Sequence, residues 1–435
     1  MSSPLRGVLL HCVSRLLGLR TPYRRLSSMK TTTLRNDLVF MFAIALVKTF
    51  KTFFRLCCPP QKHCVQTTTT MAKILSVAGL VVLCFVGIVL ASPRVTIERL
   101  NNHEPVLGWA LNNSVFPYTY NPSWLEGVDN GCMLVRCQNV TSPTNPSPGP
   151  SRLAVSCLIA GTTEAFTPIV NESVVFEPET PEEVMGTEDP RVQKINDTYY
   201  LFYTAVQKGP TDDWIARLSL ATTTTPLVKS SWQRHGALFP DVNEFQFTKS
   251  GALLVGDSWK QSYLIFGDCS LYNGLQVAVP TDETFTRYRV LEDYLLIEKR
   301  QGKFDSGLVE SGPPPMKLHD GNWFFIYNAA QHLYGTPNGF FYNAGWVVLN
   351  GSDPLTLMAR SDTPLLMPEQ PYEVMGLTPY VVFIEAMRED PGRSTQDSTA
   401  FIVYYGAADT SVAVVRVVVQ STGDGSYGVS LSKDL

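Results

Sequence analysis

The chain has 435 residues, of which 44% are hydrophobic, 11% aromatic and only 17% charged. This composition excludes disorder over most of the length and is sufficient for one large domain or two ordinary ones. Thirty Gly and thirty Pro beside so few charges favour strands and turns over long surface helices. We therefore expect a β-rich protein.

The charge is unevenly distributed along the chain. Residues 1–73 carry twelve Lys or Arg and one acid, Asp37, whereas the rest of the chain has 23 basic and 38 acidic residues. The part of the chain after residue 73, which we call the body, is too acidic to bind nucleic acid, because phosphate contacts need concentrated positive charge. We interpret the basic stretch as part of a targeting sequence, and residues 1–70 as an extension that need not belong to the mature protein.

Met71 opens a segment with the features of a secretory signal. Lys73 is followed by an apolar run over residues 74–90 and then by Ala91, which gives the basic start, apolar middle and small-residue exit of a signal peptide. We expect cleavage after Ala91. The alternative is a signal anchor that keeps residues 74–90 in the membrane. Either arrangement delivers the rest of the chain to the secretory lumen or the cell exterior.

Two features of the body agree with export. Asn-x-Ser/Thr sequons stand at Asn112, Asn139, Asn171, Asn196 and Asn350. Four cysteines remain after cleavage, an even number compatible with two disulfides whose pairing cannot be deduced: Cys132, Cys137, Cys157 and Cys269. Neither these cysteines nor the six scattered His have the spacing of zinc ligands, so we expect no metal and no other cofactor.

A recurring segment organises the body. Five stretches of branched and aromatic residues are spaced by about 60 to 80 residues, which leaves room for four short strands each. They are Gly131–Arg136, Thr198–Ala205, Ser262–Gly267, Asn322–Ala329 and Thr399–Gly406. This pattern predicts an all-β domain over residues 95–425 that is a five-bladed β-propeller, with an ordinary β-sandwich as the alternative.

A propeller brings residues at the ends of different blades to one central funnel, so chemistry is expected there. Two carboxylates on facing walls are the minimum for cleaving a glycosidic bond, one as acid and one as base. Asp189, before Pro190, and Glu310, before the rigid Gly312–Pro315 segment, are our candidate pair. Each of these residues taken alone could equally be a solvated acid in a loop.

At these residues the chain resembles glycoside hydrolase family 130. The matching motifs occur in the family's order: Gly-x-Glu-Asp-Pro-Arg at 186–191, Tyr-Tyr-x-x-Tyr-Thr-Ala at 199–205, Lys-Ser-Gly-Ala at 249–252, Gly-Pro-Pro-Pro at 312–315 and Tyr-Tyr-Gly-Ala-Ala-Asp at 404–409. The resemblance extends from about Asn121 to Asp409. It implies a five-bladed propeller that acts on β-mannosides, as a phosphorylase or as a β-1,2-mannosidase.

The resemblance also implies roles for individual residues. Asp189 matches the family's general acid, which is thought to pass its proton through a hydroxyl of the mannose. Residues that match sugar-binding positions, or flank Asp189 in its motif, are Asn121, Arg136, Glu188, Arg191, Lys249, Asp305 and Asp409. Glu310 matches the base of the hydrolase branch, and Glu385 resembles a second acid of that branch that could assist it or could be a buried structural acid.

Hydrolysis is favoured over phosphorolysis by two sequence differences. Phosphorylases of this family commonly read Tyr-His-Gly where this chain reads Tyr327-Asn328-Ala329, and a carboxylate at Glu310 would repel phosphate and could activate water. We therefore expect an inverting, exo-acting β-mannosidase whose partner is a β-mannose-containing oligosaccharide or glycan. The alternatives are a β-mannoside phosphorylase that releases mannose 1-phosphate, and a carbohydrate-binding propeller without turnover.

Overall fold

The computed structural model describes residues 95–420, except for 109–114, 141–147, 163, 212, 241–246, 268–272, 334 and 336–338. The chain divides into two units, residues 1–86 and 87–435, and every described residue belongs to the second. The predicted extension (1–70) and signal segment (71–91, with its apolar run 74–90) therefore lie outside the described residues. Within the described part, no helix has the length and hydropathy needed to cross a bilayer.

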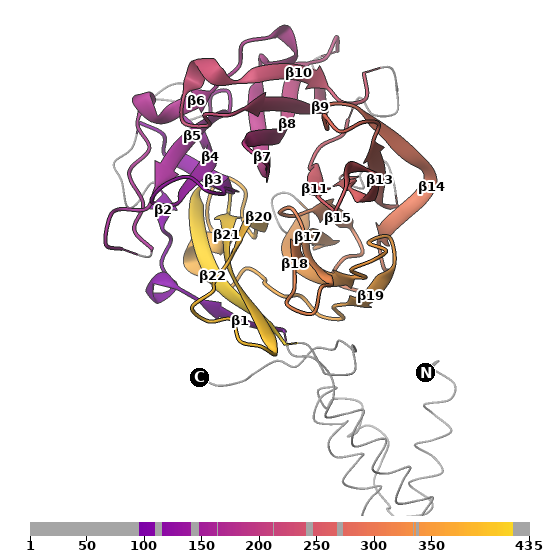
Figure 1. Cartoon of the computed structure of the whole chain (residues 1–435). Coiled ribbons are helices and arrows are strands. Elements are labelled where there is room, and N and C mark those ends of the chain that lie inside the picture. Colours follow the sequence, from indigo (N-terminus) through magenta and orange to yellow (C-terminus); the bar gives the residue numbers. More distant parts are fainter. Residues whose placement is uncertain are drawn as a thin grey trace, which may run out of the picture. The chain divides into compact units, whose positions relative to one another are not determined.

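The described unit is built from five antiparallel sheets that follow one another around a common axis (Figure 1). The first blade consists of β3 (Tyr118–Leu125), β4 (Cys132–Gln138), β5 (Arg152–Cys157) and β6 (Val174–Phe176). The second consists of β7 (Gly186–Ile195), β8 (Thr198–Lys208), β9 (Trp214–Thr223) and β10 (Gln233–Ala237). The third consists of β11 (Ala252–Leu254), β12 (Tyr263–Phe266), β13 (Gly274–Pro280) and β14 (Tyr288–Glu298).

The last two blades each carry an additional short strand. The fourth consists of β15 (Leu308–Ser311), β17 (Trp323–His332), β18 (Phe340–Leu349) and β19 (Leu357–Arg360), with β16 (Met316–Lys317) paired to β17. The fifth combines β20 (Val382–Glu389), β21 (Ser398–Ala407) and β22 (Ser411–Gln420) with β1 (Val95–Arg99) and β2 (Leu107–Gly108). Because β1 pairs with β22, from Val95 opposite Val419 to Arg99 opposite Val415, the two ends of the domain close the ring within one sheet.

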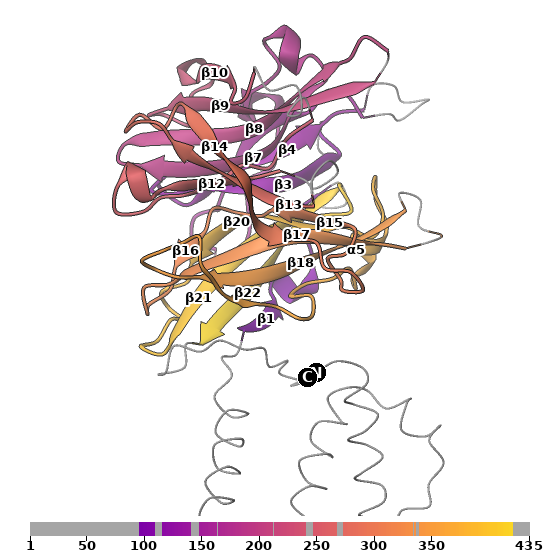
Figure 2. The same ribbon diagram turned by 90° about the vertical axis from the view of Figure 1, so that its right-hand side faces the viewer.

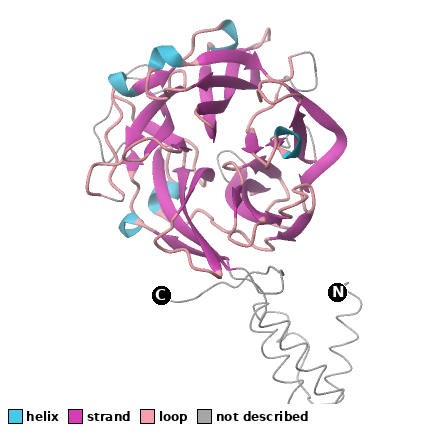
Figure 3. Cartoon of the chain, viewed as in Figure 1, coloured by secondary structure: helices cyan, strands magenta, loops and turns pink. Residues whose placement is uncertain are grey.

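The described helices are single turns outside the sheets (Figure 3). They are η2 (Asn101–His103), η3 (Asn171–Ser173), η4 (Pro181–Glu183), η5 (Lys229–Ser231), η7 (Trp259–Gln261) and α5 (Pro371–Val374).

Each of the five recurring segments forms the second strand of its blade, namely β4, β8, β12, β17 and β21. These strands are covered on both faces by neighbouring blades, so their side chains are buried almost without interruption; all ten residues of β21 are buried. Burial on both faces explains why these segments are continuously apolar rather than alternating. The five-bladed propeller is confirmed, and the β-sandwich alternative is wrong.

Five clusters of buried apolar side chains fill the five junctions between neighbouring blades. At the junction of the fourth and fifth blades, Phe324 of β17 stacks on Phe401 of β21 with ring centroids 5.6 Å apart, and Trp346 packs in the same cluster. Trp323 belongs to the cluster between the third and fourth blades, and Trp259 packs half-buried against the cluster between the second and third. These tryptophans therefore contribute to core packing.

A short motif, Glu-Val-Met-Gly, occurs before two of the five blades and makes the same contacts in both places. Before β7, Glu183 accepts hydrogen bonds from the Tyr203 hydroxyl (2.6 Å) and the Arg234 guanidinium (3.0 Å). Before β20, Glu373 accepts them from the Tyr405 hydroxyl (2.6 Å) and from Arg99 (2.9 Å). Two backbone amides also donate to each carboxylate. These contacts fix the entry of the chain into β7 and β20.

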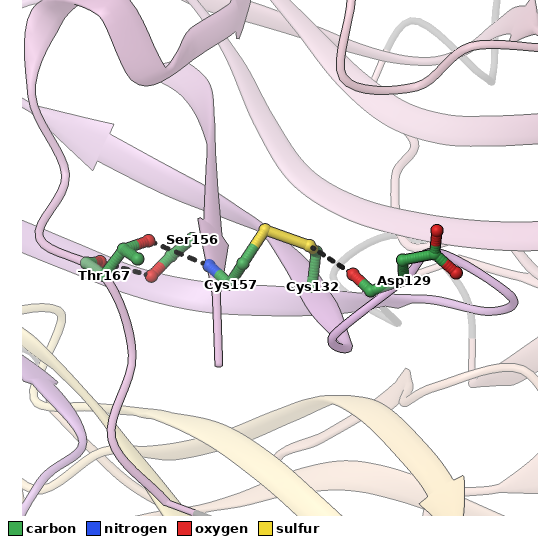
Figure 4. Close-up of a disulfide and its surroundings, with 5 residues drawn as sticks. All are labelled: Asp129, Cys132, Ser156, Cys157 and Thr167. Carbon is green, nitrogen blue, oxygen red and sulfur yellow. Dashed lines mark hydrogen bonds between the residues drawn. A yellow bond between two sulfur atoms is a disulfide. The ribbon is translucent and has the colours of Figure 1, made fainter. Parts of the chain in front are cut away.

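One disulfide is present among the described residues, and it joins adjacent strands of the first blade. Cys132 of β4 is bonded to Cys157 of β5, and the Cys157 amide donates to the Thr167 hydroxyl at 3.0 Å (Figure 4). Cys137 is a buried free thiol, and burial raises its pKa to about 12. The cysteine count was compatible with two disulfides, but Cys137 faces the packed junction between the first and fifth blades and is unpaired, so the described residues hold one. Cys269 lies outside the described residues.

Candidate active site

The first strand of each blade, or the loop leading into it, brings polar side chains to the axis of the ring. Asn121 is on β3, Asp189 on β7, Glu310 on β15 and Glu385 on β20, while Lys249 and Ser250 precede β11. All five blades thus contribute to one group of residues.

Local backbone irregularities direct three of these side chains. The register of β3 shifts at Asn121, that of β7 at Asp189 and that of β20 at Glu385. A β-bulge of this kind breaks the alternation of side chains and re-aims one of them. Asn121 and Asp189 also have φ values of 48° and 50°, a conformation that Asn and Asp tolerate better than most residues. Two of the three bulged positions are therefore also left-handed, and all three carry polar groups of the cluster.

Asp189 lies at the centre of a dense network. Its Oδ1 accepts hydrogen bonds from the Asn121 amide and from Arg136 Nη1, both at 2.8 Å, and only 4% of the residue is exposed. Burial would raise the pKa of Asp189, but the positive charges of Arg136, Lys249 and Arg191 outweigh it and hold this pKa below its ordinary value. Asp189 is thus an ionised carboxylate in the sugar-free protein.

The pKa values of two neighbouring acids, Glu188 and Asp409, shift in the opposite direction. Glu188 accepts from Arg136 Nη2 at 2.6 Å and from the Ser151 hydroxyl at 3.0 Å, yet burial raises its pKa. Burial also raises the pKa of Asp409, which lies in the hairpin between β21 and β22 and feels the charges of Arg136, Asp189 and Lys249. Carboxyl groups whose pKa values are pushed apart in one place are typical of acid–base sites.

Glu310 is buried on β15 and faces residues from the third blade. Its Oε1 accepts a hydrogen bond from the Ser250 hydroxyl and lies 3.5 Å from Lys249 Nζ. The same lysine lowers the pKa of Asp189. Lys249 therefore interacts electrostatically with both candidate carboxylates, and Asp189 and Glu310 belong to one cluster.

Arg191 connects three blades beneath this cluster. Its side chain is fully buried and donates to the carbonyl oxygens of Asp189 (3.1 Å), Ser311 (2.7 Å) and Gly312 (3.0 Å). Its Nη2 also lies 3.0 Å from Glu385 Oε1. Burial raises the pKa of Glu385 well above its ordinary value, against the opposing charge of Arg191. These contacts position the backbone on either side of the two candidate carboxylates.

Asp305 forms a second polar group. Its carboxylate accepts hydrogen bonds from Arg300 Nε at 3.0 Å, from Arg360 Nη2 at 2.7 Å and from the Tyr327 hydroxyl at 2.8 Å. Asp305 is fully buried. The hydrogen bonds described for its side chain go to Arg300, Arg360 and Tyr327 and not to Asp189 or Glu310. It anchors the loop that leads into β15.

The sequence patterns assigned no site role to Ser250, Ser151 or Tyr327. Ser250 stands within the Lys-Ser-Gly-Ala motif, so the motif contained a signal for it; Ser151 only ends a Pro-rich loop and Tyr327 is one of many strand aromatics. Within the described part of the chain, no group of three or more His, Cys, Asp or Glu is arranged to hold a metal ion.

A five-bladed propeller with carboxylates of opposed pKa at its axis is an arrangement suited to enzymes that process glycosidic bonds. A family model described as β-1,4-mannooligosaccharide phosphorylase matches residues 158–422, which is more than half of the chain. The chain therefore belongs to glycoside hydrolase family 130, as the motifs implied.

Individual relatives agree with this membership. A 1,2-β-oligomannan phosphorylase of Thermoanaerobacter sp. (strain X514) is 31% identical over 240 residues, which are 55% of this chain and 71% of that protein. A glycosyl hydrolase structure from Bacteroides ovatus has a TM-score of 0.57 at 22% identity and covers 76% of this chain and 95% of its own.

A further solved structure is described by the statement that the GH130 family of mannoside phosphorylases contains glycoside hydrolases that target β-1,2 mannosidic linkages in Candida mannan. It has a TM-score of 0.58 at 22% identity and covers 77% of this chain and 96% of its own. At such identities these two structures show the shared fold.

Proposed function

We propose that this protein hydrolyses β-mannosidic bonds, as an inverting, exo-acting enzyme on β-1,2-linked manno-oligosaccharides or glycans. The observation that carries the proposal is Glu310, a carboxylate with 1% exposure that is held by Ser250 and Lys249 in the same cluster as Asp189. A fixed, buried carboxylate repels phosphate dianion and is suited to take a proton from water.

The roles follow from an inverting mechanism. Glu310 takes a proton from a water molecule whose oxygen attacks the anomeric carbon of the terminal mannose. The glycosidic bond breaks, and its oxygen leaves with a proton that comes from Asp189 through a mannose hydroxyl. Asn121, Arg136, Glu188, Lys249 and Asp409 bind the mannose. Arg191, which is paired with Glu385, holds the backbone around the two reacting carboxylates in place.

The ionised state of Asp189 in the sugar-free protein has a consequence for this mechanism. A donor must be protonated, so Asp189 has to take up a proton when the sugar binds. Glu188 shares Arg136 with Asp189, and burial raises its pKa. Glu188 is therefore the neighbouring carboxyl group best placed to exchange a proton with Asp189. Activity should consequently be highest at mildly acidic pH.

Phosphorolysis is the second candidate, and the relatives favour it. The oligomannan phosphorylase at 31% identity is a phosphorylase by name, and so is the matching family model. Lys249 adds positive charge beside Glu310 that could attract phosphate. In this case phosphate oxygen, not water, would attack the anomeric carbon and Glu310 would have no proton to accept.

The test compares β-1,2-mannobiose cleavage in phosphate-free buffer by the wild type, Asp189→Asn, Glu310→Gln and Asp362→Asn. Asp362 is an exposed carboxylate near Arg300 and serves as the control. The hydrolase proposal predicts full activity without phosphate, a loss of about 100-fold or more in the first two variants, and no loss in the control. Activity that appears only after phosphate is added would support the phosphorylase. No turnover with or without phosphate would indicate a carbohydrate-binding protein.

We propose in addition that the enzyme acts in the secretory lumen or outside the cell. The Cys132–Cys157 disulfide fits an oxidising compartment, and the sequons at Asn171 and Asn196 are exposed. N-terminal sequencing of protein secreted from a eukaryotic host should give Ser92 as the first residue. Retention in the membrane with an intact 74–90 segment would support the signal-anchor alternative instead.

A further inference from the structure

Aromatic side chains form a row beside the central cluster, at the junction of the fourth and fifth blades. Phe383 of β20 and Tyr342 of β18 have ring centroids 6.3 Å apart, Tyr342 and Phe340 5.9 Å, and Phe340 and His332 of β17 4.6 Å. We call these four residues the aromatic row. Phe383 is buried, Tyr342 and Phe340 are half-buried and His332 is exposed, so the row becomes more accessible from Phe383 to His332.

The row begins at the candidate active site. The Phe383 ring lies under the Arg191 guanidinium, 5.9 Å from ring centroid to Cζ, and Arg191 in turn donates to the Asp189 carbonyl. Further along, the row lies against Gly307, three residues before Glu310. A Cβ at Gly307 would be 3.2 Å from Phe340 and 3.4 Å from His332. The row therefore runs alongside the segment that carries Glu310.

The row lies at the same end of the blades as the candidate carboxylates. In the fourth blade, Glu310 pairs with Asn328 and Leu308 with Ala330, so β17 continues past Glu310 toward its hairpin with β18, where His332 and Phe340 are paired. Figure 2 shows this hairpin and α5 on the same side of the ring.

The position of the row is fixed by the neighbouring blade. The Tyr342 amide donates to the Tyr380 carbonyl at 3.0 Å, and the rings of Phe341 and Tyr380 have centroids 6.1 Å apart. Tyr380 has a φ of 62°, which is unusual for a bulky residue, and such strain tends to persist where function requires it. The two blades thus hold a preformed surface next to the site.

We propose that the aromatic row binds the substrate beyond its first two sugars, that is, the third and later mannose units on the leaving-group side. This inference rests on the proposed function, because an exo-acting enzyme encloses the terminal mannose and leaves the rest of the chain to pass over a neighbouring surface. The accessible rings of the row suit the apolar faces of pyranoses, and Tyr342 and His332 also carry polar groups for their hydroxyl rims. The distance between neighbouring ring centroids is comparable to the length of one sugar unit. The row also starts at the polar cluster of the candidate active site.

The experiment measures calorimetric binding of β-1,2-mannobiose, mannotriose and mannotetraose to the Asp189→Asn protein, in which turnover does not interfere. We expect the longer sugars to bind about three- to tenfold more tightly than mannobiose. Replacing both Tyr342 and Phe340 by Leu in the same background should remove this increment, whereas Tyr342→Phe, which keeps the ring, should retain it. Trp259→Ala removes a half-buried aromatic that follows β11, at the far end of its blade from Lys249, and should also retain it.

The outcomes separate this inference from the proposed function. If mannobiose is bound or cleaved but affinity does not rise with length, or if the rise survives the double Leu substitution, the aromatic row is not a sugar site and the proposed function stands. If no β-mannoside of any length binds to the folded protein, both are overturned.

Discussion

Replacing Arg191 by Met tests the idea that one buried arginine holds the backbone of both candidate carboxylates. The substitution leaves the carbonyl oxygens of Asp189, Ser311 and Gly312 without their donor and Glu385 without its cation, all at a site with no exposure. Removing one partner of a buried ion pair costs about 3–5 kcal/mol. We therefore expect the free energy of unfolding to fall by about that amount at pH 8.

The loss should depend on pH in a defined direction. Burial raises the pKa of Glu385 above its ordinary value of 4.5, and Arg191 opposes that rise, so the pKa climbs further in the variant. A raised carboxyl pKa gives stability that is complete at low pH and lost as the pH rises above the unfolded value. The difference between wild type and variant should thus be smaller at pH 5, where Glu385 can be neutral, than at pH 8.

The assay is urea unfolding of the wild type, Arg191→Met and Arg416→Met at both pH values. Arg416 is a matched control, because it pairs with Glu98 and Asp390 near the surface and should contribute about 0–1 kcal/mol. A loss below about 1 kcal/mol for Arg191→Met, or one that is the same at pH 5 and pH 8, would refute the reasoning.

Three further predictions concern the disulfide, the repeated Glu-Val-Met-Gly motif and the pH profile. Replacing Cys132 and Cys157 together by Ala should lower the free energy of unfolding by about 3 kcal/mol, because the bond closes a loop of 25 residues, and it should abolish the effect of reductant on the unfolding temperature. Glu373→Gln removes the charge opposite Arg99 and replaces one of the two buried oxygens that accept from Tyr405 or from Arg99 and two amides, and it should cost about 2–4 kcal/mol by urea unfolding. Glu369→Gln in the same turn, 63% exposed, should cost little. Arg136→Met withdraws a charge that lowers the pKa of Asp189, so the side of the kcat/KM profile that falls with rising pH should move to higher pH; an unmoved profile would show that Asp189 is not the titrating donor.

The sequence was sufficient for the fold because the propeller repeats its most buried strand. Segments such as Thr198–Ala205 and Thr399–Gly406 are covered on both faces. Their residues are therefore apolar almost without interruption, and this pattern can be recognised in the sequence. The family motifs then identified the first strands that meet at the axis. Asp189 and Glu310 are distant in the chain but lie in one cluster, because each stands on the first strand of its blade, β7 and β15.

Other features depend on geometry that local patterns do not encode. No residue pattern marks the register shift at Glu385, whereas the shifts at Asn121 and Asp189 each stand before a proline, which cannot donate to a strand ladder. The Cys132–Cys157 disulfide depends on which strands are adjacent, and Cys137 faces a packed junction instead. Asp305 is bonded to Arg300, before the fourth blade, and to Arg360, at the end of β19, and its own motif does not reveal that these partners hold it apart from the central cluster.

The most direct test of the central claim is proton NMR of the first sugar released from β-1,2-mannotriose in phosphate-free buffer. If Glu310 activates water opposite the leaving group, the first product is α-mannose, which then equilibrates with the β anomer. Release of β-mannose, or of α-mannose 1-phosphate only after phosphate is added, would contradict the account.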